Sequence, residues 1–196
     1  MKKFYLLAVF ALIAIPAAFM SFKKPEPQPK EGDKTHINWL TMDELQMKMK
    51  ANPKRVYIDF YTDWCGWCKR MDATTFSNPD VVKYMNENFY CVHFDAERKD
   101  KFRFMGQEWY YDADKKSNTL AYQLMNGKLA FPTSCFMEPL YQNPQPIPNY
   151  FTVEQFECIA KFFATNAYKS TPWAEWQKNF KNEWKGADAG APPAGH

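Results

Sequence analysis

The chain has 196 residues, of which 46% are hydrophobic and 24% are charged, so its composition is that of a folded globular protein rather than a disordered one. Its 7 glycines exclude a collagen-like protein, and 5 cysteines are too few for a disulfide scaffold of this length. The formal net charge is +3, and two of the positive charges, Lys2 and Lys3, lie at the N-terminus. The remaining residues carry no basic stripe, so we expect no nucleic-acid partner.

The first 22 residues predict export. Two lysines precede an apolar run over residues 4–20, which is typical of a secretory signal peptide. Pro16, Phe19 and Met20 obscure any cleavage site, and the run is slightly shorter than the roughly 18–20 residues of a membrane-spanning helix. Residues 1–22 are therefore either a cleaved signal peptide or a retained membrane anchor, and both readings predict an exported, periplasmic protein.

Three further segments follow the export segment. Residues 23–34 are rich in proline and charge, which predicts a semi-extended linker. Residues 35–185 carry the periodic patterns of a folded domain. Residues 186–196 are rich in alanine, glycine and proline, which predicts a disordered tail.

Helices and strands alternate in the first half of the domain. The capping-box sequence TMDE starts a helix over residues 41–50, and residues 55–61 (RVYIDFY) predict a strand buried on both faces. A short helix over residues 65–73 follows. An Asn-Pro pair opens a helix over residues 78–88, and residues 89–95 (FYCVHFD) predict a second buried strand.

The second half begins with a small hairpin over residues 102–111, which is expected to turn near Gly106. The other elements predicted before the C-terminal segment are a helix over residues 118–125, strands over 133–137 and around 147–150, and a helix over 152–167 that starts with a second capping box, TVEQ.

A last helix is predicted to begin at Thr171 and Pro172. Its aromatic residues recur on one helical face and are expected to pack on the domain's own core: Trp173, Trp176, Phe180 and Trp184. The order of elements predicts an α/β fold, in which a central mixed β-sheet is flanked by helices, with an inserted hairpin and an extra C-terminal helix.

The strongest functional signal is the sequence WCGWCK at residues 64–69, which follows a buried strand and opens a helix. Free N–H groups and the helix dipole stabilise a thiolate at a helix N-terminus, so we expect a low thiol pKa for Cys65. Cys68 lies one turn later on the same face, close enough to form a disulfide with Cys65. An exposed, low-pKa thiol beside a shielded one is what thiol–disulfide exchange requires.

Three other roles compete for this motif. Haem attachment requires a histidine after the second cysteine, where this chain has Lys69. A zinc or copper site requires two more ligands, and the compact pair Cys91 and His93 lies on one buried strand, an unfavourable place for a tetrahedral site. The third alternative is a structural disulfide, although tight C-x-x-C loops are strained and reducible. We expect no metal, and no cofactor beyond the redox-active pair Cys65 and Cys68.

A carboxylate inside an apolar strand is the second functional signal. Asp59 lies six residues before Cys65, in the middle of the first buried strand, where a charge is costly. Two hypotheses follow. Either Asp59 is paired with a buried donor, or desolvation raises its pKa so that it exchanges a proton with Cys68.

In these motifs the chain resembles the thioredoxin superfamily. The matching residues are Asp59-Phe60, Trp64-Cys65-Gly66-Trp67-Cys68-Lys69 and Phe131-Pro132-Thr133. Over about residues 37–169 the chain is similar to exported thioredoxin-like proteins with a WCxWCK motif, and to the thioredoxin-like domain of membrane thiol:disulfide interchange proteins. The resemblance implies a thioredoxin fold and protein thiol–disulfide oxidoreductase activity.

The resemblance also implies a role for each matching residue. Cys65 would be the nucleophile, Cys68 the resolving thiol and Asp59 the proton acceptor. The bond between Phe131 and Pro132 would be cis, packed against the disulfide and offering backbone to a substrate strand. The residues expected to contact substrate are Trp64, Gly66, Trp67, Phe131 and Pro132.

The sequence departs from thioredoxin itself in three ways. Trp67 replaces the proline usual between the cysteines, the segment before the Phe-Pro pair is longer, and Cys91 stands where many thioredoxins carry a lysine. Of the other cysteines, Cys91 and Cys135 are expected to be buried and inert, and Cys158 to be partly exposed on a helix flank.

The sequence therefore predicts an exported thiol–disulfide oxidoreductase. Neither Gly66 nor Trp67 supplies the positive charge that stabilises the thiolate of a strong oxidant, so the reducing direction is favoured. The expected partners are protein disulfides and dithiols and an electron-transfer partner in the membrane, and the protein is expected to be a monomer. The alternatives are a redox-inert thioredoxin-fold binding or adaptor module and, less favoured, a C-x-x-C metal carrier.

Overall fold

The computed structural model describes residues 35–186. The predicted export segment, the predicted linker and residues 187–196 of the predicted tail lie outside the described residues. Among the helices of residues 35–186, none is long and apolar enough to cross a membrane.

A four-stranded mixed sheet forms the centre of the domain. Its strands are β1 (Arg55–Tyr61), β2 (Phe89–Asp95), β7 (Thr133–Glu138) and β8 (Gln142–Pro148), in the spatial order β2-β1-β7-β8. β1 runs parallel to β2 and antiparallel to β7, and β7 runs antiparallel to β8. The predicted mixed sheet is confirmed. The last strand begins earlier than predicted, because β8 is an edge strand, where the prolines that interrupt its pattern are tolerated.

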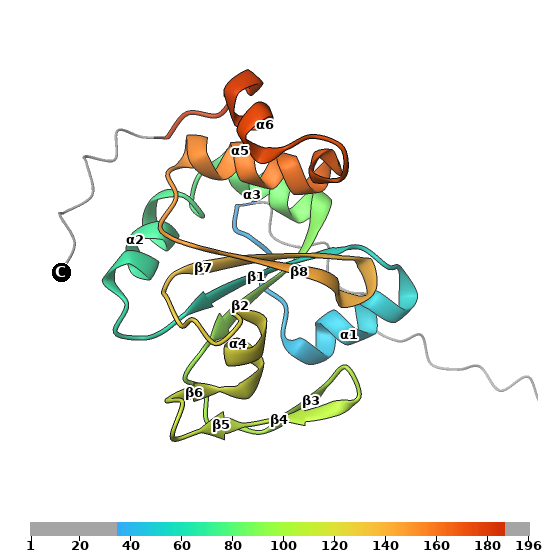
Figure 1. Cartoon of the computed structure of the whole chain (residues 1–196), viewed down its shortest axis with the longest axis vertical. Helices are drawn as coiled ribbons and strands as arrows, with labels where there is room; N and C mark the ends of the chain where they lie inside the picture. Colours follow the sequence, from blue (N-terminus) through green and yellow to red (C-terminus); the bar gives the residue numbers. More distant parts are fainter. Residues whose placement is uncertain (1–34, 187–196) are drawn as a thin grey trace, which may run out of the picture. The chain divides into compact units, whose positions relative to one another are not determined.

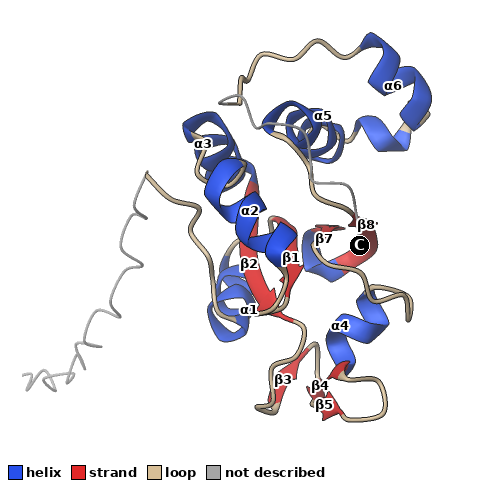
Figure 2. Ribbon diagram, turned by 90° about the vertical axis from the view of Figure 1, so that its left-hand side faces the viewer, coloured by secondary structure: helices blue, strands red, loops and turns tan. Residues whose placement is uncertain are grey.

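Helices cover both faces of the sheet, as Figures 1 and 2 show. One face packs against α2 (Gly66–Thr74), α3 (Pro79–Asn88) and α5 (Val153–Ala164), and the other against α1 (Met42–Ala51) and α4 (Thr119–Leu124). Both predicted capping boxes form, at the starts of α1 and α5. A short 3-10 turn, Pro139–Tyr141, follows β7. A second one, Ala167–Lys169, follows α5, which ends at Ala164, slightly before its predicted end.

The central strand β1 contributes side chains to both faces. Val56, Ile58 and Phe60 pack in the core beneath α1 and α4, whereas Tyr57 packs in the core beneath α3 and α5. Full burial of such a side chain stabilises the fold by roughly 1.5–3 kcal/mol. Since side chains alternate along a strand, Asp59 shares the face of Tyr57 and is the one charged residue in the middle of this strand.

The predicted hairpin is present between β2 and α4. Its strands β3 (Phe102–Phe104) and β4 (Gln107–Trp109) join through Met105 and Gly106, both with positive φ. The indole N–H of Trp109 donates to the backbone oxygen of Phe104 at 2.9 Å, and both side chains are buried in the core beneath α1 and α4. A second hairpin of β5 (Tyr111–Asp112) and β6 (Ser117–Asn118) was not predicted, because two-residue strands are too short to show alternation.

The last helix is shorter than predicted. α6 covers Trp173–Asn179, with Pro172 as its N-cap. The backbone of Phe180 is extended, with ψ of 135°. The prediction of a single helical face continuing to Trp184 is therefore wrong.

The buried carboxylate of Glu157 holds the segment after α6 outside the helix. It accepts hydrogen bonds from the backbone N–H groups of Glu183 and Trp184, both at 3.0 Å, and from the side chain of Asn182 at 3.0 Å. Backbone N–H groups that donate to Glu157 are not available for the hydrogen bonds of a continuing helix. Trp184 is nevertheless buried, with its ring 5.2 Å from that of Tyr84, so this residue packs on the domain's own core as expected.

Candidate active site

The cysteine pair lies where the chain passes from β1 into α2. Cys65 is the N-cap of α2, and the backbone N–H of Cys68 donates to its Sγ at 3.0 Å. The two cysteines form a disulfide, with their Cα atoms 5.3 Å apart. The structure therefore has Cys65 at the helix N-terminus and its disulfide partner one turn later, where the sequence places them.

Both cysteines are shielded in this disulfide form. Cys65 is 4% exposed and Cys68 is 2% exposed, whereas the preceding Trp64 is 66% exposed. The predicted exposure of Cys65 concerns its thiol form; in the disulfide form its Sγ is bonded to Cys68 and accepts the N–H of that residue.

Two aromatic residues from distant segments meet beside the cysteine pair. The ring of Trp64 packs edge-on against that of Phe131, with centroids 5.9 Å apart, and its indole N–H donates to Glu97 at 3.1 Å. The peptide bond between Phe131 and Pro132 is cis, as the resemblance implies. The loop before α2 and the segment before β7 are thus in contact at this end of the sheet.

The two residues between the cysteines have different surroundings. Trp67 packs against Tyr150, with ring centroids 5.3 Å apart, and the guanidinium of Arg70 lies 5.9 Å from its centroid. Trp67 is therefore held by the segment before α5. A Cβ atom built on Gly66 would meet no atom within 4 Å, so the space beside Gly66 is open.

A second group of polar residues joins β1, β2 and the last turn of α2. Asp59 on β1 is 1% exposed and pairs in the sheet with His93 on β2. Oδ2 of Asp59 lies 3.2 Å from Nε2 of His93, and that nitrogen lies 3.8 Å from Oδ1 of Asp72 on α2. The Asp59–His93 contact has the distance of an ion pair but not the alignment of a hydrogen bond.

Aromatic stacking holds the imidazole of His93. Its ring lies 3.8 Å from that of Tyr61 with an interplanar angle of 20°, and 5.1 Å from that of Trp39 with an angle of 30°. The ring is therefore fixed in plane, with its Nε2 edge toward the two aspartates.

The electrostatics of this group are dominated by burial. Loss of water raises the pKa of the Asp59 carboxyl above its ordinary value, and the nearby His93 opposes this effect without cancelling it. Burial likewise raises the pKa of Asp72, whose side chain is 42% exposed. Asp59 is thus a buried carboxyl that holds its proton more tightly than a carboxyl in water.

Sequence reasoning missed His93 as the neighbour of Asp59 and considered Cys91 at the position of the thioredoxin lysine. In the structure Cys91 pairs with Tyr57, two residues away from the Asp59 position. The signal was present in the sequence, because aligning the parallel strands 55–61 and 89–95 end to end places Asp59 opposite His93.

The three remaining cysteines are free and buried. Burial raises the thiol pKa of Cys91, of Cys135 (to about 12) and of Cys158. The prediction that Cys158 is partly exposed is wrong, because α6 lies over this part of α5 and the indole of Trp176 donates to the backbone oxygen of Cys158 at 3.0 Å. None of the three lies at a helix N-terminus as Cys65 does, so Cys65 and Cys68 are the reactive candidates.

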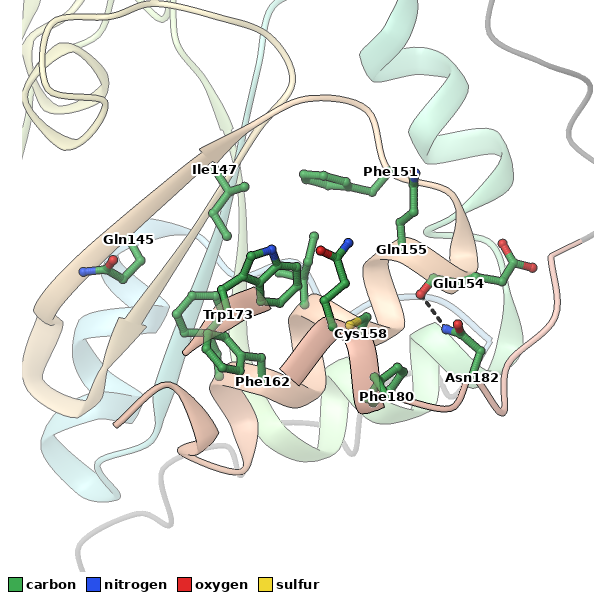
Figure 3. Close-up of a pocket in the computed structure, with 13 residues that line it drawn as sticks. Gln145, Ile147, Phe151, Glu154, Gln155, Cys158, Phe162, Trp173, Phe180 and Asn182 are labelled. Carbon is green, nitrogen blue, oxygen red and sulfur yellow. Dashed lines mark hydrogen bonds between the residues drawn. The ribbon is translucent and has the colours of Figure 1, made fainter. Parts of the chain in front are cut away.

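A cavity of about 560 Å³ lies between β8, α5 and the segment that contains α6. Figure 3 shows the rings of Phe162, Trp173 and Phe180 around it, with Cys158 at its wall. None of residues 59–72 lines this cavity, so it is separate from the cysteine pair.

Comparison with protein families and known sequences finds thioredoxin-like and thiol:disulfide interchange proteins. A family model described as thioredoxin-like matches residues 38–139. The thiol:disulfide interchange protein DsbD of Salmonella typhi is 34% identical over 87 residues, which are 42% of this chain and 15% of that protein. DsbD of Escherichia coli K12 is 45% identical over 53 residues, which are 25% of this chain and 9% of that protein. The chain thus matches only a small part of the length of these relatives.

Two solved structures are similar in their backbone. A DsbH oxidoreductase has a TM-score of 0.48 and 14% sequence identity, covering 72% of this chain and 95% of its own. The reduced C-terminal domain of DsbD from Neisseria meningitidis has a TM-score of 0.42 and 19% identity, covering 64% of this chain and 98% of its own.

The raised pKa of Asp59 generates a prediction about stability. Above its ordinary pKa of 3.8, an unfolded Asp59 loses its proton more readily than the folded one, so folding is weakened as the pH rises through the folded pKa. Asp59→Asn should therefore increase the free energy of unfolding at pH 7–8 by about 1–3 kcal/mol. The gain should vanish below the ordinary pKa, where Asp59 is protonated in both states.

Urea unfolding of the disulfide form at a series of pH values measures this difference. Asp114→Asn, at an exposed loop position, is the matched control and should change stability by less than about 0.5 kcal/mol. A gain that does not depend on pH, or a loss at neutral pH, would contradict the assignment of a buried, costly charge.

Proposed function

Because this chain belongs to the thioredoxin-like family, we propose that it is a protein thiol–disulfide oxidoreductase that works through Cys65 and Cys68. The observation that carries the proposal is the disulfide between these residues at the N-terminus of α2. The relatives it matches are thiol:disulfide interchange proteins, which supports the same reaction class.

The reaction begins with the dithiol form. The thiolate of Cys65 attacks one sulfur of a substrate disulfide, a mixed disulfide forms, and the other substrate sulfur leaves as a thiolate. Cys68 then loses its proton and attacks Sγ of Cys65, which closes the internal disulfide and releases the second substrate thiol. Two electrons pass to the substrate, and the pair Cys65 and Cys68 is oxidised.

The helix N-terminus favours the first step. The N–H of Cys68 lies 3.0 Å from Sγ of Cys65 and can donate to a thiolate there. The dipole of α2 adds a partial positive charge at the same point. Both effects lower the energy of the thiolate relative to the thiol, which is what the attacking cysteine needs near neutral pH.

Asp59 serves the second step as the proton acceptor for Cys68. Burial raises its pKa toward the operating range, where a carboxyl can both take and release a proton. The carboxyl is 1% exposed, which limits proton exchange with solvent during resolution.

The substrate contacts follow from the surfaces around the disulfide. Trp64 is largely exposed and rests on Phe131, so the two rings offer an apolar contact beside the cysteines. Gly66 leaves the backbone open for close approach. Together with Trp67 and Pro132, these residues form the proposed binding surface for an extended segment of a protein substrate.

The proposal also includes the direction of thiol–disulfide exchange and the cellular compartment. The residues between the cysteines, Gly66 and Trp67, provide no positive charge, which favours the reducing direction over strong oxidation. The lysines and the apolar run of residues 1–22 support an exported, periplasmic protein, either released or anchored. Its partners would be protein disulfides and dithiols and a membrane electron-transfer protein, and it would act as a monomer.

The assignment of the two cysteines predicts different behaviour for their variants. Cys68→Ala leaves the helix N-terminal environment of Cys65 intact and removes only resolution, so this variant should accumulate mixed disulfides with its substrates. Cys65→Ala should trap few, because Cys68 lies one turn inside α2, away from the N-cap position at which the helix stabilises a thiolate. Each full-length variant would be expressed in its native compartment, and dithiothreitol-sensitive adducts would be counted and identified by mass spectrometry.

Equal adducts in both variants would refute this division of roles. Cys91→Ala, which removes a buried thiol on β2, is the matched control and should trap no more than the unaltered protein. An absence of adducts in Cys65→Ala and Cys68→Ala alike would favour the redox-inert binding module instead.

The role of Asp59 predicts a kinetic effect that is separate from its effect on stability. Asp59→Asn cannot accept the proton of Cys68, so dithiothreitol-driven reduction of insulin should slow by about tenfold or more near neutral pH. The rate would be measured across pH 6–9, with Asp114→Asn as control. Identical profiles for Asp59→Asn and the unaltered protein would show that Asp59 has a structural role alone.

A further inference from the structure

We propose that Asp59, Asp72 and His93 form a binding site for one divalent transition-metal cation. Each side chain offers one ligand atom, and these atoms lie within 4.8 Å of one another. They come from β1, α2 and β2, so the packing of the sheet and helix holds the cluster together rather than a flexible loop.

The distances suit a small cation. In a tetrahedral zinc site with bonds of about 2.0–2.1 Å, neighbouring ligand atoms lie about 3.3 Å apart. Nε2 of His93 lies 3.2 Å from Oδ2 of Asp59 and 3.8 Å from Oδ1 of Asp72. The carboxylate of Asp72 is 42% exposed, so it has the freedom to close the remaining gap, and it gives the site an opening to solvent.

Unsatisfied polar atoms point to a ligand at this position. Oδ1 of Asp59 and Nε2 of His93 are both buried, and neither makes a hydrogen bond among the described residues. The Asp59 side chain is only 2% exposed, and leaving one oxygen of such a buried carboxylate without a hydrogen bond is costly. A cation bound between the three side chains would give Nε2 of His93 a partner, and a carboxylate that ligates through both oxygens would also satisfy Oδ1 of Asp59. The stacking of His93 between Tyr61 and Trp39 already fixes the imidazole.

The donor set defines the chemical class of the cation. One imidazole nitrogen and two carboxylate oxygens suit Zn²⁺, Mn²⁺ or Fe²⁺. No thiolate belongs to the cluster, so this site differs from a metal carrier built on Cys65 and Cys68. It would form with the disulfide closed.

One consequence rests on the proposed function. A cation bound to Asp59 would occupy the carboxyl that accepts the proton of Cys68. Occupancy should therefore slow thiol–disulfide exchange, and the site would couple metal availability to redox activity.

Binding is tested on the oxidised full-length protein, in which Cys65 and Cys68 cannot act as ligands. Titration with Zn²⁺ against a chromogenic chelator should give one site per chain, and the visible spectrum of bound Co²⁺ should show nitrogen and oxygen ligands without thiolate. Asp72→Asn and His93→Gln should each weaken Zn²⁺ binding at least tenfold. Asp72 is half exposed, so its variant should fold even if the stacked His93 position does not tolerate glutamine.

Asp114→Asn and His36→Gln are the matched controls, because both replace exposed residues of the same types, and they should bind Zn²⁺ like the unaltered protein. Unchanged Zn²⁺ affinity in Asp72→Asn and His93→Gln would overturn the proposal. So would binding that the controls weaken equally.

The coupling to exchange is measured separately, by single-turnover reduction of a disulfide peptide with Mn²⁺, which binds carboxylate and imidazole in preference to thiolate. The rate should fall in the unaltered protein and be much less sensitive to Mn²⁺ in Asp72→Asn. If Mn²⁺ competes with Zn²⁺ for the site in the chelator titration but leaves the rate unchanged, the site is supported and the proton-acceptor role of Asp59 is contradicted.

Discussion

The burial of β1 on both faces is the constraint on which the site depends. Val56, Ile58 and Phe60 anchor the strand on one side and Tyr57 on the other, so its position in the sheet cannot shift without exposing apolar surface. The chain leaving this strand enters α2 with Cys65 as its N-cap. The same strand holds Asp59 in the core. One packed element therefore places both the thiol chemistry and the buried carboxyl.

Burial of Asp59 raises the pKa of its carboxyl, and this shift determines the acid–base chemistry of the site. Strand register decides what lies beside it, because a slip of one residue in β2 would put Val92 or Phe94 opposite Asp59 in place of His93. With the observed register, an imidazole stacked between two aromatic rings lies 3.2 Å from the carboxylate. The contact moderates the effect of burial on the Asp59 pKa but does not reverse it.

Local signals in the sequence predicted much of the fold. The capping boxes that start α1 and α5 use hydrogen bonds within four residues, and β1 and β2 have compositions typical of buried strands. The C-x-x-C motif is likewise local, so its placement at the start of α2 followed from the strand before it.

The features that were missed depend on contacts between distant residues. The aromatic spacing after Thr171 fits a helix, yet the amides of Glu183 and Trp184 bind Glu157, about 26 residues earlier, and these two residues are not helical. His93 became a site residue only through the pairing of two strands. No periodicity in a single segment carries such information.

Whether Cys65 and Cys68 exchange electrons reversibly is measured by an equilibrium redox titration in thiol–disulfide buffers. The native protein is alkylated at each potential, and its mass is determined by mass spectrometry. The account predicts one reversible two-electron transition in which two thiols per chain become reactive, while Cys91, Cys135 and Cys158 stay unmodified. The midpoint should lie near that of thioredoxin, at about −270 mV, rather than near the roughly −120 mV of a strong periplasmic oxidant. A chain whose Cys65 and Cys68 never titrate as a reversible pair would contradict the claim that this protein exchanges disulfides.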